Sequence, residues 1–164
     1  MSQESHVFQR HLDEQRNHVL GILDGLSDDA LRQPTLPSGW NCLGLVKHLA
    51  LDVEHYWFRC IVAGEPLEFF TSMPEHERDL WQVRPDETAA DIFTLYRHEI
   101  ERSNTVIADT PLDAPPHQRD AWWGEWDVPD LRFILFHVIK ETACHAGHLD
   151  AARELIDGRQ WIVL

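Results

Sequence analysis

The segment between Asn41 and Pro66 carries apolar residues at alternating spacings of four and three. The repeating positions are Cys42, Val46, Leu49, Val53, Tyr56, Cys60 and Ala63. On a helix this spacing forms a single apolar stripe about six turns long. Such a stripe is stable only when other elements cover it, and Gly64 and Pro66 follow as helix-ending residues. The segment therefore predicts a long helix that faces a core.

Three further segments show helical spacing of apolar residues, and strand signals are nearly absent. We expect these helices over about Glu4 to Gly25, from Asp86 or Thr88 to just before Pro111, and from the Asp127 and Pro129 pair to Gly158. Four amphipathic helices of this length predict an all-α four-helix bundle, one domain spanning residues 1–164. The connections over 64–85 and 110–128 are long for a bundle, and long loops are often functional.

Charge and cysteine content narrow the functional classes. Asp and Glu number 28 against 14 Lys and Arg, a net charge of −14, which argues against binding nucleic acid or anionic lipid. No run approaches the roughly 20 apolar residues of a membrane span, and the first residues lack a signal core, so we expect a soluble cytoplasmic protein. The chain has three cysteines, Cys42, Cys60 and Cys144. Their odd number and the absence of zinc-finger spacing favour buried free thiols.

The apolar face of the last predicted helix is interrupted by polar residues. Steps of three and four from Leu131 reach Glu141, His145 and His148 before returning to apolar positions. Glu141 and His145 are one turn apart and point the same way. A buried carboxylate is costly unless it is paired or bound to metal, and a divalent cation accepts carboxylate oxygen and imidazole nitrogen together. A buried Glu–His pair without metal, or a helix face exposed to a water-filled groove, would also explain the pattern.

A metal site at this position needs a ligand from another helix. In the second helix His48, Asp52 and His55 lie at i, i+4 and i+7, on the flank of the apolar stripe. Periodicity alone does not place His48 in the core, and a surface histidine is the alternative. In the second long connection three tryptophans could cover an apolar group or merely cap the end of the bundle: Trp122, Trp123 and Trp126.

The chain resembles the DinB/YfiT-like superfamily of metal-binding four-helix bundles in two stretches, GLVKHLALDVEHYWF and LFHVIKETACHAGHLDAARELIDG. The resemblance is closest to the branch with mycothiol-dependent maleylpyruvate isomerase and related thiol S-transferases. It implies an up-down-down-up chain path and a divalent metal, zinc or nickel. The implied ligands are His48, Glu141 and His145. It places His148, where many relatives carry Gln, in an outer-shell or substrate-facing position, and we assign it a catalytic role.

The resemblance implies a metal-dependent S-transferase or isomerase that uses a low-molecular-weight thiol, such as mycothiol, and a small-molecule electrophile. A metal-dependent hydrolase and a non-enzymatic metal-binding stress or regulatory domain are the alternatives, because the superfamily does not share one reaction. Four arginines are candidates for holding an anionic substrate: Arg78, Arg84, Arg119 and Arg132. A homodimer is left open.

Overall fold

The computed structural model describes residues 2–67 and 80–161, and every regular element within these ranges is helical. The elements are α1 (Gln3–Leu23), α2 (Asp28–Arg32), α3 (Cys42–His48), η1 (Leu49–Val62), α5 (Ala89–Asp109), η3 (Ala121–Trp123) and α6 (Leu131–Asp157). The described ranges contain no strand. The all-α prediction is therefore confirmed. The short helix α2 and the single 3₁₀ turn η3 were not predicted, because each is too short to show a period.

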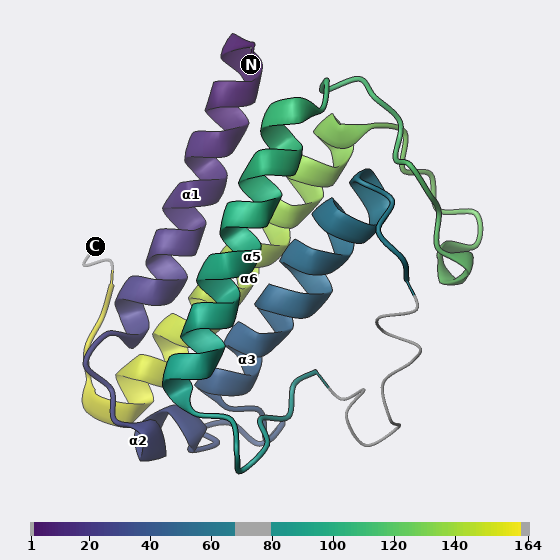
Figure 1. Cartoon of the computed structure of the whole chain (residues 1–164). Helices are drawn as coiled ribbons and strands as arrows, with labels where there is room; N and C mark the ends of the chain where they lie inside the picture. Colours follow the sequence, from purple (N-terminus) through teal and green to yellow (C-terminus); the bar gives the residue numbers. More distant parts are fainter. Residues whose placement is uncertain (1, 68–79, 162–164) are drawn as a thin grey trace.

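The long helices pack side by side around one apolar core. α1 packs mainly against α6, and α5 packs against η1, which continues directly from α3. In Figure 1, α1 and α6 run toward one end of the molecule, while α3–η1 and α5 run toward the other. The core side chains come from all of these helices. This arrangement sets the middle of α6 beside the junction of α3 and η1.

The ends of the helices follow local capping chemistry. Thr88 caps α5 as one of the two predicted candidates, in a reciprocal capping box with Asp91. Gly158 ends α6 with φ +80, the left-handed conformation for which glycine is suited. The predicted start of α6 at Asp127 and Pro129 was wrong. Asp130 is the N-cap instead, because its side chain accepts the Phe133 backbone N–H.

The segment η1 is wound as a π-helix rather than as the regular helix that its spacing suggested. At its end the Ala63 N–H donates to the Phe58 carbonyl, five residues back, at 3.0 Å. π-turns are rare and often lie at functional sites. Almost the whole of η1 is buried, including Glu54 and His55 outside the predicted stripe. A wider turn and packing on several sides explain why a single stripe did not describe this helix.

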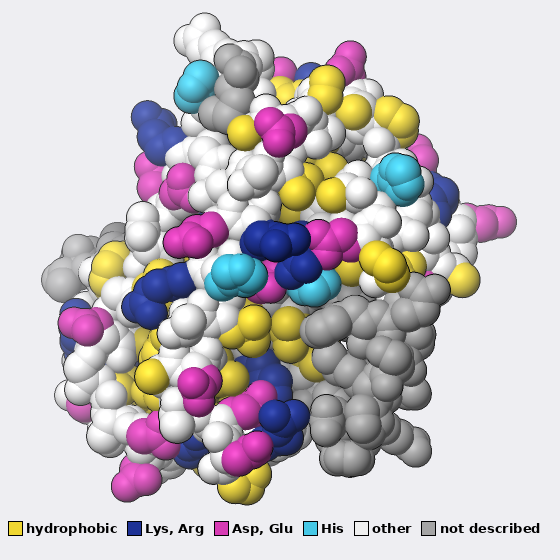
Figure 2. All heavy atoms as spheres, viewed as in Figure 1, with side chains coloured by type: hydrophobic (Ala, Val, Ile, Leu, Met, Phe, Trp, Pro, Cys, Tyr) yellow, Lys and Arg dark blue, Asp and Glu magenta, His cyan; other side chains and the backbone are white. Residues whose placement is uncertain are grey.

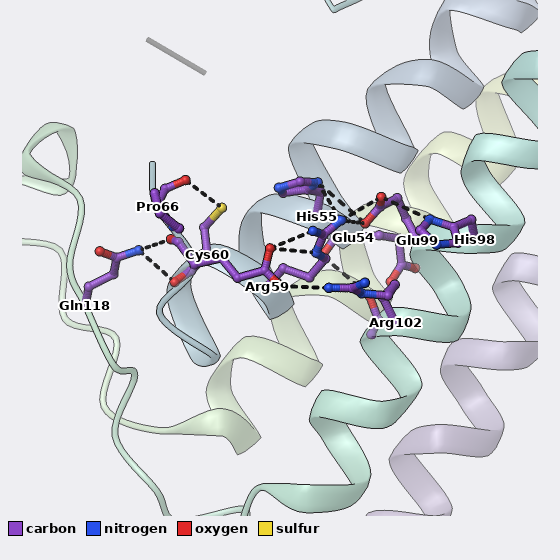
Figure 3. A network of polar contacts seen from close by, with 11 residues as sticks. Glu54, His55, Arg59, Cys60, Pro66, His98, Glu99, Arg102 and Gln118 are labelled. Atoms are coloured by element: carbon purple, nitrogen blue, oxygen red, sulfur yellow. Dashed lines mark hydrogen bonds and ion pairs between the residues drawn. The ribbon is translucent and has the colours of Figure 1, made fainter. Parts of the chain in front are cut away.

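Charged groups fasten η1 to its neighbours. The Arg59 guanidinium donates to Glu99 of α5 at 2.9 Å and to Glu65 at 2.6 Å, and His55 lies 3.5 Å from Glu99 (Figure 3). On the other side Arg16 of α1 forms a bidentate pair with buried Glu54, at 2.7 Å for each bond. These pairs fix η1 against both α5 and α1.

The apolar face of α6 does not follow the predicted positions to its end. Leu131, Ile134 and Val138 are buried as expected, but Leu155 is 62% exposed, and His148 is exposed too. A strict repeat of three and four drifts about 20° per heptad around a straight helix. The buried face therefore moves to Thr142, Ala146, Leu149 and Arg153. Glu141 and His145 border this face and stay partly accessible, instead of lying at its centre.

The surface mixes both signs of charge. In Figure 2, on the face seen in Figure 1, Lys and Arg side chains lie beside Asp and Glu side chains. Of the helices in the described ranges, none is both long enough and apolar enough to cross a membrane.

Candidate metal centre

The structure brings together the three predicted metal ligands. His48 comes from the end of α3, and Glu141 and His145 come from successive turns of α6. One donor atom from each residue lies within 4.8 Å of the other two. Two imidazoles and a carboxylate are a donor set that zinc and nickel accept. Helical spacing predicted the i, i+4 pair on α6, whereas His48 was predicted only through the resemblance to the family.

His48 carries the observation that best fits a metal. The residue is 8% exposed, and its Nε2 atom is buried with no hydrogen-bond partner among the described residues. Glu141 Oε1 lies 3.7 Å from Nε2, which is too far for a hydrogen bond. Nδ1 bonds to Asp52 at 2.8 Å, so the neutral ring donates there and keeps the Nε2 lone pair free. A cation between the three donors would satisfy this orphaned atom.

Asp52 therefore belongs to the centre, although the superfamily pattern assigned it no place. A carboxylate that holds the far nitrogen of a ligating histidine fixes the ring and its tautomer. Burial alone would lower the pKa of His48, but the hydrogen bond to Asp52 and the nearby Glu141 outweigh it and raise the pKa above its ordinary value. His55 lies apart from the three donors, in the network of Arg59 and Glu99.

Glu141 is held by a histidine that the sequence analysis missed. His137 Nε2 lies 3.1 Å from Glu141 Oε2, and its ring packs against Trp57 at 4.8 Å and Trp126 at 5.3 Å. Burial raises the pKa of Glu141, but the contacts with His137 and His48 prevail and lower the pKa to about 2. The carboxylate is thus ionised and oriented. The i, i+4 spacing of His137 and Glu141 was the available signal.

His145 is prepared to bind as a neutral ring. Burial first, and then the positive charge of His48, lowers the pKa of His145 to about 4. Trp81 stacks on His48 with ring centres 4.2 Å apart and lies 5.6 Å from the ring of His145. An unprotonated imidazole keeps the lone pair that a metal needs.

His148 lies beside the donors but outside the cavity described next. Its Nδ1 is 3.4 Å from His145 Nδ1, and its exposed ring lies 6.1 Å from that of Trp40. The structure therefore places His148 in contact with His145, and the catalytic role of His148 stays a prediction.

A cavity of about 680 Å³ opens directly beside the donors. Its lining consists of Asp52, Tyr56, Trp57, Trp126, His137, Lys140, Glu141, Cys144 and His145. Of the loop tryptophans, Trp126 covers this apolar space as one reading expected, and Trp123 is buried beneath it. The side chain of Trp122 lies outside the described part.

Cys144 is exposed, so the prediction of a buried thiol was wrong there and confirmed for Cys42 and Cys60.

Three of the four arginines proposed as substrate ligands lie in the described part of the chain, and none of these three lines the cavity. Arg84 pairs with Asp86, and Arg132 pairs with Glu4. Arg119 lies over the ring of Trp123, and Arg78 falls outside the described residues. The cation in the lining is Lys140, which the sequence analysis did not single out.

We expect His137→Phe to weaken metal affinity by about 10- to 100-fold, the usual effect of removing an outer-shell partner. Phenylalanine keeps the ring between the two tryptophans but releases Glu141. A titration with a competing chelator measures the change, with His98→Phe on the exposed side of α5 as the control. Equal affinities for the two variants would remove His137 from the centre.

Metal affinity should fall as the pH falls through the raised pKa of His48, because a proton on Nε2 must leave before a metal can bind. His145 adds a second proton only near pH 4. About one proton should thus be released per metal just below the pKa of His48, as measured by calorimetry in buffers of different ionisation enthalpy. Asp52→Asn removes a carboxylate that raises the pKa of His48, so the fall in metal affinity should shift to lower pH. A pH profile unchanged by Asp52→Asn would contradict this account.

Comparison with known proteins agrees with this geometry. The family model described as mycothiol-S-transferase matches residues 7–158, nearly the whole chain. Searches of curated proteins and of solved structures found no match. The matched range contains all three donors and the cavity lining. The chain therefore belongs to the mycothiol-S-transferase family.

Proposed function

We propose that this protein is a metal-dependent enzyme that transfers a low-molecular-weight thiol, mycothiol, to a small electrophile. The observation that carries the proposal is the buried Nε2 of His48, which has no hydrogen-bond partner among the described residues and lies near Glu141 and His145, two residues that line an aromatic cavity. The family match supports the thiol. The helix directions of Figure 1 support the DinB-like up-down-down-up four-helix bundle that this assignment implies.

The proposed ligands are His48, Glu141 and His145, with zinc or nickel as the ion. When bound, the divalent cation supplies positive charge that lowers the pKa of a nearby thiol. Asp52 and His137 hold the ligand side chains in place. Three protein ligands leave room for a further donor, which is the usual arrangement of a catalytic site.

The net reaction combines a thiol R–SH with an electrophile R′–X to give R–S–R′ and HX. The sulfur forms the new bond to carbon as the leaving group departs with its electron pair. We assign to His148 the removal of the thiol proton, because its ring is exposed and its Nδ1 lies 3.4 Å from Nδ1 of His145. The aromatic walls of the cavity offer apolar contacts to the electrophile.

The test is conjugation of mycothiol to an aryl halide, followed by mass spectrometry of the product. Zinc- or nickel-loaded protein should form the thioether, and chelator should abolish its formation. His148→Gln should lower kcat while metal content stays unchanged. A product that contains water instead of sulfur would favour the hydrolase, and stoichiometric metal without turnover would favour a non-enzymatic protein.

A further inference from the structure

The cavity beside the three donors has an aromatic wall. The rings of Trp57 and Trp126 meet at 90° with centres 5.8 Å apart, and His137 packs against both. Tyr56 continues this wall, and its ring meets that of Trp57 edge-on at 5.2 Å. Faces and edges of aromatic rings attract a further ring in stacked or perpendicular geometry. The wall therefore suits a planar apolar group.

The lining carries two carboxylates, Asp52 and Glu141, and one lysine, Lys140. Asp52 and Glu141 are engaged with His48 and His137. Lys140 is exposed, and in the described part of the chain it has neither an ion pair nor a hydrogen bond. An anionic group entering this cavity would be repelled by the two carboxylates and attracted by Lys140.

We propose that this cavity is the electrophile subsite and that it selects planar aromatic electrophiles carrying a carboxylate, with the ring against Trp57 and Trp126 and the carboxylate at Lys140. The inference rests on the function proposed above, because it names the molecule that the thiol attacks. The volume of about 680 Å³ lies within the range of small-molecule sites and exceeds what one ring needs. Selection by Lys140 adds a charge requirement to the shape requirement of the wall.

The experiment measures binding without any reaction. Metal-free protein is titrated with 2-naphthoate and with neutral 2-naphthalenemethanol, which share a ring system, by calorimetry. Naphthoate should bind about 5- to 10-fold more tightly, as expected for one charge-assisted contact at an exposed site. Lys140→Gln should abolish this preference. Arg10→Gln, which removes one positive charge from the exposed side of α1, should leave it intact.

Two further measurements locate the ligand. Trp126→Leu should weaken binding of both naphthalenes by about 3- to 10-fold, because it removes part of the wall that they share. Cys144 lines the same cavity and is exposed, whereas Cys42 and Cys60 are buried. Naphthoate should therefore slow alkylation of Cys144 by iodoacetamide. Alkylation at an unchanged rate under saturating naphthoate would place the ligand elsewhere and overturn the proposal.

Other results separate this proposal from the proposed function. Binding of naphthoate only to metal-loaded protein, with no effect of Lys140→Gln, would mean that the carboxylate ligates the metal, and would overturn the role of Lys140. Absence of naphthoate binding alongside thiol conjugation would overturn the subsite and leave the enzyme intact. Protein without metal or turnover that still binds naphthoate through Lys140 would support a binding site for aromatic carboxylates, but it would refute the transferase and with it the role of this site as an electrophile subsite.

Discussion

His145→Ala is expected to lose metal binding almost completely. His145 is one of the three proposed donors, so the loss of affinity should exceed the roughly 100-fold upper effect of removing a residue that only supports a ligand. Thiol conjugation should fall to the level of protein treated with chelator. Elemental analysis after dialysis measures metal content, and a competing chelator measures the remaining affinity.

His55→Ala and His98→Ala are the controls for this variant. His55 lies in the Arg59 and Glu99 network, and His98 is exposed on α5. Both variants should keep their metal, while His48→Ala should behave like His145→Ala. Full metal content in His145→Ala would remove this residue from the centre. Loss of metal in His55→Ala but not in His48→Ala would mean that the ligand from α3–η1 is His55 and that its assignment to His48 is wrong.

The second large effect is on thermal stability. A metal bound only by the folded state stabilises it by about 4 kcal/mol at a concentration 1,000 times its Kd. For a chain of this size that corresponds to a rise in Tm of roughly 10 °C. A strong chelator should therefore lower the Tm of the wild type by about this amount. The same chelator should lower the Tm of Glu141→Gln by only a few degrees, because this variant has lost a charged ligand and binds little metal that chelator could remove.

The two proteins should melt within a few degrees of each other in chelator. Glutamine keeps the shape of Glu141, and the carboxylate it replaces is compensated by His137 and His48 in the metal-free protein. That compensation also means that Glu141 is not an unpaired buried charge. A wild-type Tm indifferent to chelator, together with a more stable Glu141→Gln variant, would leave the proposed enzyme without its metal.

Local chemistry explains which parts of the fold were predictable. The caps of α5 and α6 at Thr88 and Gly158 depend on a few neighbouring residues, so sequence was sufficient to place them. The start of α6 was missed because two aspartates compete as caps, and only Asp130 has its side chain on the Phe133 N–H. The π-winding of η1 was missed because apolar spacing describes a helical stripe and not the hydrogen bonds within the helix.

The same division applies to the candidate site. The pairing of Glu141 with His145 follows from the pitch of one helix, and the motif around His48 carried the resemblance to the family. The sequence by itself determined these residues and the all-α class, because each depends on neighbours within a few turns or on a motif. Only the tertiary structure decided that His48 is buried and that, among the described residues, its Nε2 has no hydrogen-bond partner. The tertiary structure also decided that His137, packed against two tryptophans, contacts Glu141, and that Lys140 lies at the cavity with no carboxylate partner in the ranges that the structure describes. Those features depend on how α3–η1, α6 and the loop with Trp126 approach one another, and side-chain packing across separate elements leaves no period in a single sequence.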